Sequence, residues 1–471
     1  MHLIFHGTLI HSASLTELEI IENGLIVIDT EAGGTIVHLA RNIAAPDVDR
    51  HLEEAVATAS IPNLDLASSS SSSPSSYSLR RLSRSEFLIP GFVDTHNHAP
   101  QYAQRGLGQS MHILDWLAQV TFPNEARFAD PEHARRVYAR CVRGFLRQGI
   151  TTASYYGSMH AAATNILADQ CLAQGQRAFV GKCNMNREAP DYYRDASAQA
   201  SLDDTRSCIA HIKSIDPRGV LLKHVLTPRF AITCDEELLR GLGQIAREEE
   251  EKGEGGLPIQ THFNEAEQEI VYTKKLFPQF DNEADLYEHF GLLGRRTILA
   301  HCCHMTEYEF GRLRELDCGV AHCPVSNMTV GGGFMAAPIR QFLKRGVKVG
   351  LGTDSGGGFS SSILDAMRQA LVASNAHEVA SKGEDKGLTI PEVFYLATMG
   401  GARVCCLEDK IGSFEVGKEF DAILVNADAP GGIMTMVEEE DSLATVFDKF
   451  VMTGDDRNME EVFVRGRSVK V

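Results

Sequence analysis

The segment Pro90-Gly91-Phe92-Val93-Asp94-Thr95-His96-Asn97-His98 is an apolar strand pattern that ends in two histidines two positions apart. Side chains alternate along a strand, so His96 and His98 point to the same side and can share one metal ion. An HxH pair alone is a weak indication, because two histidines at this spacing often occur by chance. The pair therefore has to be weighed together with the rest of the chain.

Strand patterns alternate with helical patterns across the middle of the chain. One helix is expected from an N-cap at Asp130 and a first-turn proline at Pro131 to a stop at Gly149. The strand candidates are Phe87 to Thr95, Ile150 to Ser154, Arg177 to Gly181, Val220 to Leu226, Pro258 to His262, Thr297 to His301, Gly319 to His322 and Val347 to Thr353. Eight alternating β/α units predict an α/β fold of the (β/α)8 TIM-barrel type over residues 89–407.

Both ends of the chain carry short, β-branched strand patterns, such as Leu25 to Ile28 and Phe420 to Val425. We therefore expect residues 1–88 and 408–471 to build one small composite β-sandwich domain outside the barrel. Between them, residues Ala67 to Ser78 are almost pure serine, a composition that predicts a mobile surface loop.

Composition excludes several classes of function. The 471 residues include 45 Lys plus Arg against 63 Asp plus Glu, and the net charge of -18 disfavours binding to nucleic acid or to an acidic membrane surface. No apolar run approaches the length of a membrane span, and the first basic residue is Arg41, so neither a membrane anchor nor a secretory signal is expected. We expect a cytoplasmic protein whose 11 cysteines are reduced thiols.

Polar residues also stand at the ends of three later strands. Strand five ends in His262 with Glu265 behind it, strand six ends in His301, and strand eight leads into Asp354. The carboxyl ends of barrel strands form the active-site face, so all of these residues should meet at one rim. Catalytic zinc takes nitrogen and carboxylate ligands and keeps one position open. The predicted metal ligands are His96, His98, His262 and Asp354, with Zn²⁺ as the cofactor.

Each of these residues taken alone could be a satisfied core or capping residue, as Asp354 could be for a helix that starts near Ser360. The combination PGFVDTHNH, THFNE, AHCCH and GTDSGG, however, resembles the amidohydrolase superfamily. Four further segments narrow the resemblance to its guanine deaminase branch: HAPQYAQRG, the stretch from Leu114 to Pro123, Thr227-Pro228-Arg229-Phe230, and AHCP leading into Ser326-Asn327. Two departures stand out: the serine stretch, and Val325 with the glycines Gly331 to Gly333, where more polar residues are expected.

The resemblance implies hydrolytic deamination of guanine to xanthine and ammonia, within purine catabolism, by a homodimer. A bound zinc ion lowers the pKa of its water to about 7 and so provides hydroxide at neutral pH. Three residues are then expected to be catalytic. Glu265 shuttles protons to the base, Asp354 orients and deprotonates the water, and His301 stabilises the attacking oxygen without being a primary ligand.

The purine base is expected to bind through Gln101, Arg229, Phe230 and His262. Arg229 would donate to the purine carbonyl, Gln101 would pair with a ring edge, and Phe230 would pack on the ring face. Without the resemblance, Gln101 and Phe230 would be interpreted as ordinary packing at the barrel rim.

Two alternatives stay open at this point. The chain could be a related amidohydrolase deaminase that acts on cytosine, adenine, a thiolated nucleoside or a triazine, since the metal residues do not separate these substrates. It could also be a catalytically silent scaffold, although such a protein is expected to have lost metal ligands that are present here.

Overall fold

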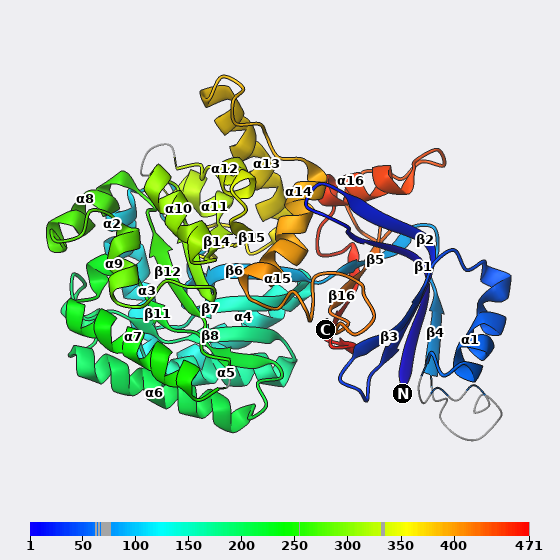
Figure 1. Cartoon of the computed structure of the whole chain (residues 1–471), viewed down its shortest axis with the longest axis horizontal. Helices are drawn as coiled ribbons and strands as arrows, with labels where there is room; N and C mark the ends of the chain where they lie inside the picture. Colours follow the sequence, from blue (N-terminus) through cyan, green and yellow to red (C-terminus); the bar gives the residue numbers. More distant parts are fainter. Residues whose placement is uncertain (62–63, 65, 67–76, 254, 331–334, 471) are drawn as a thin grey trace.

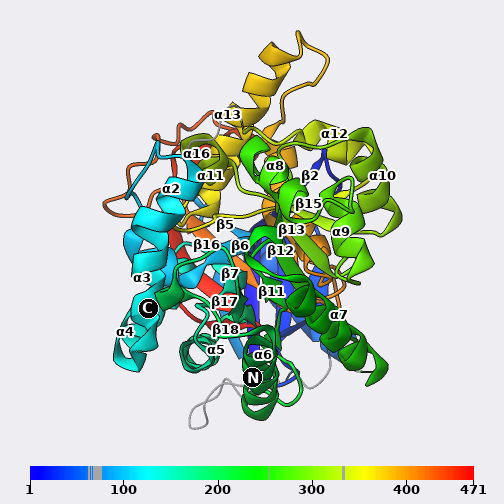
Figure 2. The same cartoon turned by 90° about the vertical axis from the view of Figure 1, so that its left-hand side faces the viewer.

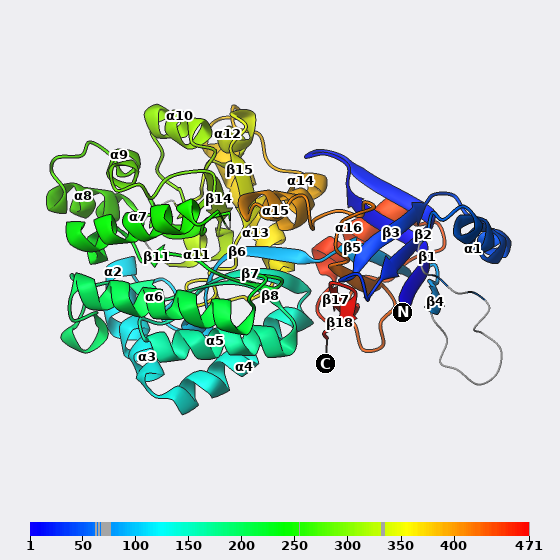
Figure 3. The same cartoon turned by 60° about the horizontal axis from the view of Figure 1, so that its bottom comes forward.

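A computed structural model describes residues 1–61, 64, 66, 77–253, 255–330 and 335–470. The molecule has an α/β part and a β-rich part that lie side by side (Figure 1), and both ends of the chain are in the β-rich part (Figure 3). The predicted mixture of helices and strands is therefore confirmed. Among the described residues, every helix is too short or too polar to cross a lipid bilayer.

The α/β part contains two parallel four-stranded sheets, ordered β6-β7-β8-β10 and β12-β13-β14-β15. Their strands are β6 (Phe92–His98), β7 (Ile150–Tyr156), β8 (Arg177–Gly181), β10 (Leu222–His224), β12 (Ile259–Phe263), β13 (Thr297–His301), β14 (Gly319–His322) and β15 (Lys348–Leu351). A short parallel pair, β9 (Cys183–Asn184) and β11 (Thr227–Pro228), accompanies them.

The two sheets border one another at both edges. Between β10 and β12, the amide of Leu226 donates to the carbonyl of Pro258 at 2.9 Å and the amide of Gln260 donates to the carbonyl of Leu226 at 2.8 Å. Between β15 and β6, the hydroxyl of Thr95 donates to the carbonyl of Leu351 at 2.8 Å. The carboxyl ends of the two sheets are thus drawn together on one side of the α/β part.

Most of the helices surround these central strands (Figure 2), whereas α1 lies beside the β-rich part (Figure 1). Asp130 caps α4 as predicted, because its carboxylate accepts from the amide of Glu132 at 2.9 Å. The helices are α1 (Val48–Ala57), α2 (Ile113–Trp116), α3 (Phe122–Ala126), α4 (Pro131–Arg147), α5 (Ala161–Gln174), α6 (Ala198–Ile215), α7 (Glu236–Glu251), α8 (Glu267–Leu276), α9 (Glu283–His289), α10 (Glu307–Glu315), α11 (Pro324–Thr329), α12 (Ile339–Lys344), α13 (Ile363–Ala380), α14 (Ile390–Tyr395), α15 (Gly401–Val404) and α16 (Leu443–Thr453).

The strand predicted from Phe87 to Thr95 is wrong as one continuous element. It consists of β5 (Glu86–Pro90), which pairs with strands of the β-rich part, and β6, which pairs with β7. The division falls at Gly91, where a Cβ atom would lie 2.3 Å from the side chain of Thr151. Glycine is needed here because the backbone passes too close to β7 for any side chain.

The β-rich part is built on one eight-stranded sheet with the order β18-β17-β16-β5-β1-β2-β3, and β4 pairs with β1. Its remaining strands are β1 (His2–Ser12), β2 (Leu18–Asp29), β3 (Thr35–Ala40), β4 (Tyr77–Arg81), β16 (Ala422–Asn426), β17 (Met459–Val464) and β18 (Arg467–Ser468). Strands from both chain ends share this sheet, as the sequence predicts. The two-layered sandwich stays a prediction.

Two sequence features fall partly or wholly outside the described residues. Of the predicted serine-rich loop, residues 67–76 lie outside them, whereas Tyr77 and Ser78 belong to β4, so the loop prediction is wrong for these two residues. The glycines Gly331 to Gly333 also lie outside the described residues.

A buried ion pair joins the two parts of the molecule. Arg177 at the start of β8 is 3% exposed and lies 2.5 Å from a carboxylate oxygen of Glu419 and 3.3 Å from one of Asp421. Asp421, just before β16, is also 3% exposed and accepts the amide of Arg465 at 2.8 Å. Removing the arginine would leave a buried carboxylate without a counter-charge.

We expect Arg177→Met to lower the free energy of unfolding by about 3–5 kcal/mol, the usual effect of breaking a buried pair from one side. Urea denaturation measures this change. Arg147→Met is the matched control, because Arg147 and Asp456 join the same two parts at an exposed position, 3.4 Å apart. The control should change stability by less than about 1 kcal/mol, and equal effects of both variants would contradict the role given to Arg177.

Candidate metal centre and active site

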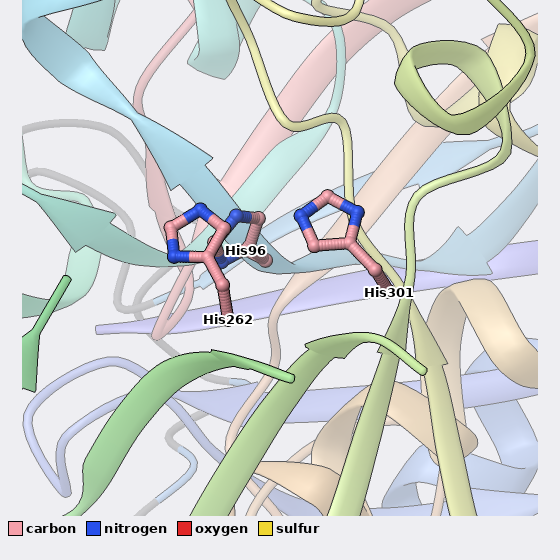
Figure 4. A group of neighbouring side chains, drawn as sticks. All are labelled: His96, His262 and His301. Carbon is pink, nitrogen blue, oxygen red and sulfur yellow. The ribbon is translucent and has the colours of Figure 1, made fainter. Parts of the chain in front are cut away.

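The predicted metal ligands come from three different strands and lie in two overlapping groups that share His96. His96 and His98 end β6, His262 lies in β12, and Asp354 follows β15. Figure 4 shows the rings of His96, His262 and His301 gathered above the ends of their strands. His301 is the last residue of β13.

The distances between these side chains fit a shared cation. One Asp354 oxygen lies 3.4 Å from His96 Nε2 and 3.5 Å from His98 Nε2. The Nε2 atoms of His98 and His262 are 3.1 Å apart. Donor atoms of His96, His98 and Asp354 all lie within 4.8 Å of one another, and so do those of His96, His262 and His301. His301 is thus near enough to be a ligand, a role that the sequence did not give it.

Hydrogen bonds on the far side of two rings set their tautomers. His96 Nδ1 lies 2.6 Å from the side-chain oxygen of Gln260, and His262 Nδ1 lies 2.6 Å from the backbone carbonyl of Arg229. Both partners are acceptors, so each Nδ1 carries the proton and each Nε2 presents a lone pair to the common point. His96 Nε2 is buried and has no hydrogen-bond partner among the described residues. A metal ion satisfies such an atom.

The protonation states also match metal ligation. Burial lowers the pKa of His98 and His262 well below the ordinary histidine value, so both rings are neutral. Burial alone would raise the pKa of Asp354, but its contacts with the imidazoles of His96, His98 and His301 outweigh burial and hold this pKa well below its usual range. Neutral imidazole and ionised carboxylate are the forms that bind divalent metals.

Glu265 and His301 lie beside this cluster. Burial and the nearby carboxylate of Asp354 raise the pKa of Glu265 well above its ordinary value, so this group can hold a proton at neutral pH. His301 Nδ1 lies 3.5 Å from a Glu265 oxygen and 2.8 Å from the side-chain oxygen of Asn327. A proton carrier and an oriented imidazole therefore stand at the edge of the metal centre.

A single pocket contains almost all of the residues that the sequence singled out. Its lining includes His98, Gln101, Arg229, Phe230, His262, Glu265, His301 and Asp354, together with apolar side chains of α2 and its surroundings. His96 lies behind His98 and does not line the pocket. The ring centroids of Phe230 and His262 are 6.2 Å apart, so an aromatic wall stands next to the metal cluster.

Four functional side chains were missed in the sequence. Gln260 had a usable signal, since it stands two residues before His262 and alternation places it on the same face of β12. Asn327 stands in a quoted motif but was given no role. Glu125 in α3 and Glu269 in α8 carry no strand-end signal, although Glu269 accepts the amide of Glu265 at 2.9 Å and thereby fixes its backbone.

Comparison with known proteins agrees with this geometry. Residues 87–469 match the family model described as "Amidohydrolase family". The chain is 39% identical to the probable guanine deaminase of Schizosaccharomyces pombe, with 99% of this chain and 83% of that protein covered. It is 36% identical to the guanine deaminase of Dictyostelium discoideum, with 99% and 98% covered.

A solved structure extends the likeness to three dimensions. The guanine deaminase from C. acetobutylicum with bound guanine in the active site is 29% identical to this chain and has a TM-score of 0.84, with 99% of this chain and 100% of that chain covered. The chain therefore belongs to the amidohydrolase family, and within it to the group that contains the guanine deaminases.

Proposed function

We propose that this protein catalyses the hydrolytic deamination of guanine to xanthine and ammonia. The proposal rests on the composition of one pocket. In it, the histidines and Asp354 that could hold a metal ion, and Glu265, which can hold a proton, face Arg229, Gln101 and Phe230. The relatives named as guanine deaminases support the same substrate. Purine catabolism, a homodimer and a cytoplasmic location belong to the proposal as the sequence implies them.

His96, His98, His262 and Asp354 would hold a zinc ion, for which their nitrogen and carboxylate donors are suitable ligands. When bound, zinc supplies Lewis-acid chemistry that makes water nucleophilic at neutral pH. The ordered rings of His96 and His262, fixed by Gln260 and the Arg229 carbonyl, support this ligand set.

The other side chains move protons and orient the reactants. Asp354, held ionised, accepts the hydrogen bond of the attacking water, orients it and takes its first proton. Glu265, whose raised pKa keeps a proton available, gives that proton to the ring nitrogen beside the carbon under attack. The proton that Asp354 took from the water then passes to the departing amine, and the hydroxyl proton of the attacked carbon returns to Glu265 as ammonia leaves. His301, oriented by Asn327, stabilises the attacking oxygen.

On the other wall of the pocket, the base is bound by directed contacts. Arg229 donates to the purine carbonyl, Gln101 pairs with a ring N–H, and Phe230 covers the ring face next to His262. A pocket that bonds the polar edges of its substrate rejects analogues that lack them, because its own buried groups are then left unpaired.

The architecture behind this site is part of the proposal. We infer that the two parallel sheets close into one (β/α)8 barrel over residues 89–407, since hydrogen bonds join them at both edges. Residues 1–88 and 408–471 would then form the composite β-domain, and both the barrel and its boundaries rest on the family likeness and on the sequence pattern.

The direct test uses the purified full-length protein with its metal. We expect about one zinc per chain by metal analysis and release of ammonia and xanthine from guanine, with much slower release from adenine, cytosine or a triazine. Faster turnover of another base would replace guanine as the substrate. A metal-free protein that stays inactive after zinc is added would favour the scaffold alternative.

Glu265→Gln tests the proton carrier. The amide keeps the shape of the side chain but cannot transfer a proton, so we expect normal zinc content with kcat lowered by about 10²–10⁴-fold. Steady-state assays with guanine measure the loss. Glu267→Gln makes the same change at a nearby exposed position in α8 and should leave kcat within about twofold. An unchanged rate in Glu265→Gln would remove this residue from the reaction.

A further inference from the structure

Glu125 joins the two polar side chains on the recognition wall of the pocket. It lies in α3, is 1% exposed, and accepts from Arg229 Nη1 at 2.7 Å and Nη2 at 3.3 Å. The same carboxylate accepts from Gln101 Nε2 at 2.7 Å and from the hydroxyl of Tyr193 at 2.7 Å. Four donors from three separate segments therefore meet on one buried carboxylate.

This carboxylate decides which way the Gln101 amide faces. An ionised carboxylate only accepts hydrogen bonds, so Gln101 has to turn its NH₂ group toward Glu125 and its carbonyl oxygen away. That oxygen, Oε1, is buried and has no hydrogen-bond partner among the described residues, while Gln101 itself lines the pocket. A buried carbonyl without a donor is costly, and an N–H group of a bound ligand would satisfy it.

The neighbouring Gly356 gives the amide room to hold this orientation. Its backbone has a φ of +125°, and a Cβ atom on it would lie 2.1 Å from Gln101 Oε1. A side chain at this position would displace the carbonyl oxygen from its place.

Arg229 is fixed by the same carboxylate. Burial alone would lower the pKa of its guanidinium, but the charge of Glu125 raises it above the ordinary value, so the group stays a cation inside the protein. Two nitrogens of the fork bind Glu125, and Phe122 lies under the guanidinium at 5.4 Å. The side chain is thus held as a donor in one orientation.

We propose that Glu125 is the positioning residue for substrate specificity, because it fixes a hydrogen-bond acceptor at Gln101 and a cationic donor at Arg229 on one wall of the pocket. This pair is complementary to a base that offers an N–H donor and a carbonyl acceptor on one edge, as an oxopurine does. A base with neither group leaves both side chains unpaired. The inference rests on the proposed function and names the device by which that site selects its substrate.

The test compares guanine with 2-aminopurine, which carries the same leaving amine but lacks the ring carbonyl and the N–H beside it. In Glu125→Gln, the new amide can donate to Gln101 and no longer pins Arg229 by charge. We expect kcat/KM for guanine to fall about 10- to 100-fold, the usual effect of losing hydrogen bonds to a charged group. For 2-aminopurine we expect a change below about threefold, so the preference for guanine shrinks by at least about threefold while the zinc content stays normal.

Glu392→Gln is the matched control. Glu392 in α14 is also a buried carboxylate that binds both terminal nitrogens of an arginine, Arg340, but it lies outside the pocket. This variant should lose stability as Glu125→Gln does and yet keep the wild-type ratio of the two substrates. A purely structural role of Glu125 predicts that both substrates lose activity equally, and that result would overturn the inference.

The outcomes for the wild-type protein separate the two proposals. A wild-type protein that does not deaminate guanine would overturn the proposed function and this inference with it. An active wild-type protein whose substrate ratio does not change in Glu125→Gln would overturn the inference alone. If Glu125→Gln does not fold, Glu125→Asp keeps the charge but withdraws it from Gln101 and Arg229. Glu125→Asp should lower the ratio of kcat/KM for guanine to that for 2-aminopurine by about three- to tenfold. An unchanged ratio would again reject the positioning role of Glu125.

Discussion

The meeting of Asp354 with the imidazoles of His96, His98 and His262 is the constraint on which the rest of the structure depends. A carboxylate enclosed by protein needs positive charge nearby, and the imidazoles of His96 and His262 present only lone pairs because their Nδ1 atoms bind acceptors elsewhere. A cation held by the cluster would satisfy the carboxylate and these lone pairs together. Such a cation would also account for the hydrogen bonds of Gln260 and the Arg229 carbonyl, which orient the rings of His96 and His262. Apolar side chains of α2 enclose the site, and a dry surrounding strengthens each electrostatic contact.

Unusual backbone conformations are concentrated where the strands deliver these side chains. Asn264, His301 and Asp354 all have φ between 41° and 76°, a region that residues other than glycine seldom adopt. Each follows or ends a strand at the active-site rim, so the chain turns sharply just where a side chain has to leave the sheet. Such residues cost about 1–3 kcal/mol each and persist because the surroundings fix them. Here the amide of Asp354 donates to the carbonyl of His96 at 2.9 Å. The amide of Cys302, which follows His301, donates to the carbonyl of Phe263 at 3.0 Å.

The sequence located the cluster that could hold a metal ion more completely than the pocket wall around Arg229 and Gln101. His96, His98, His262 and His301 could be found because strands end in polar residues at one rim, and that rule needs only local patterns. Glu125 could not be found in this way, because its role depends on Arg229, 104 positions away, and on Gln101. The mixed α/β class followed from alternating patterns, whereas the break between β5 and β6 depends on the close approach of Thr151 to Gly91, which no local pattern reveals.

Arg229 connects the histidine cluster with the opposite wall of the pocket, because its backbone contacts the first and its side chain belongs to the second. Its backbone carbonyl accepts from His262 Nδ1 and so orients a metal-facing ring, while its guanidinium is bound to Glu125 on the recognition wall. The hydroxyl of Tyr156 lies between two backbone carbonyl oxygens of this region, 3.1 Å from that of Pro228 and 2.9 Å from that of Gln260, and can donate to either. Because both ends of Arg229 are fixed before any ligand arrives, little reorganisation remains to be made on binding. In the proposed binding mode, the position of the base relative to the metal-facing rings would be set by the length of one rigid residue, which is the precision that a reaction at a single ring carbon requires.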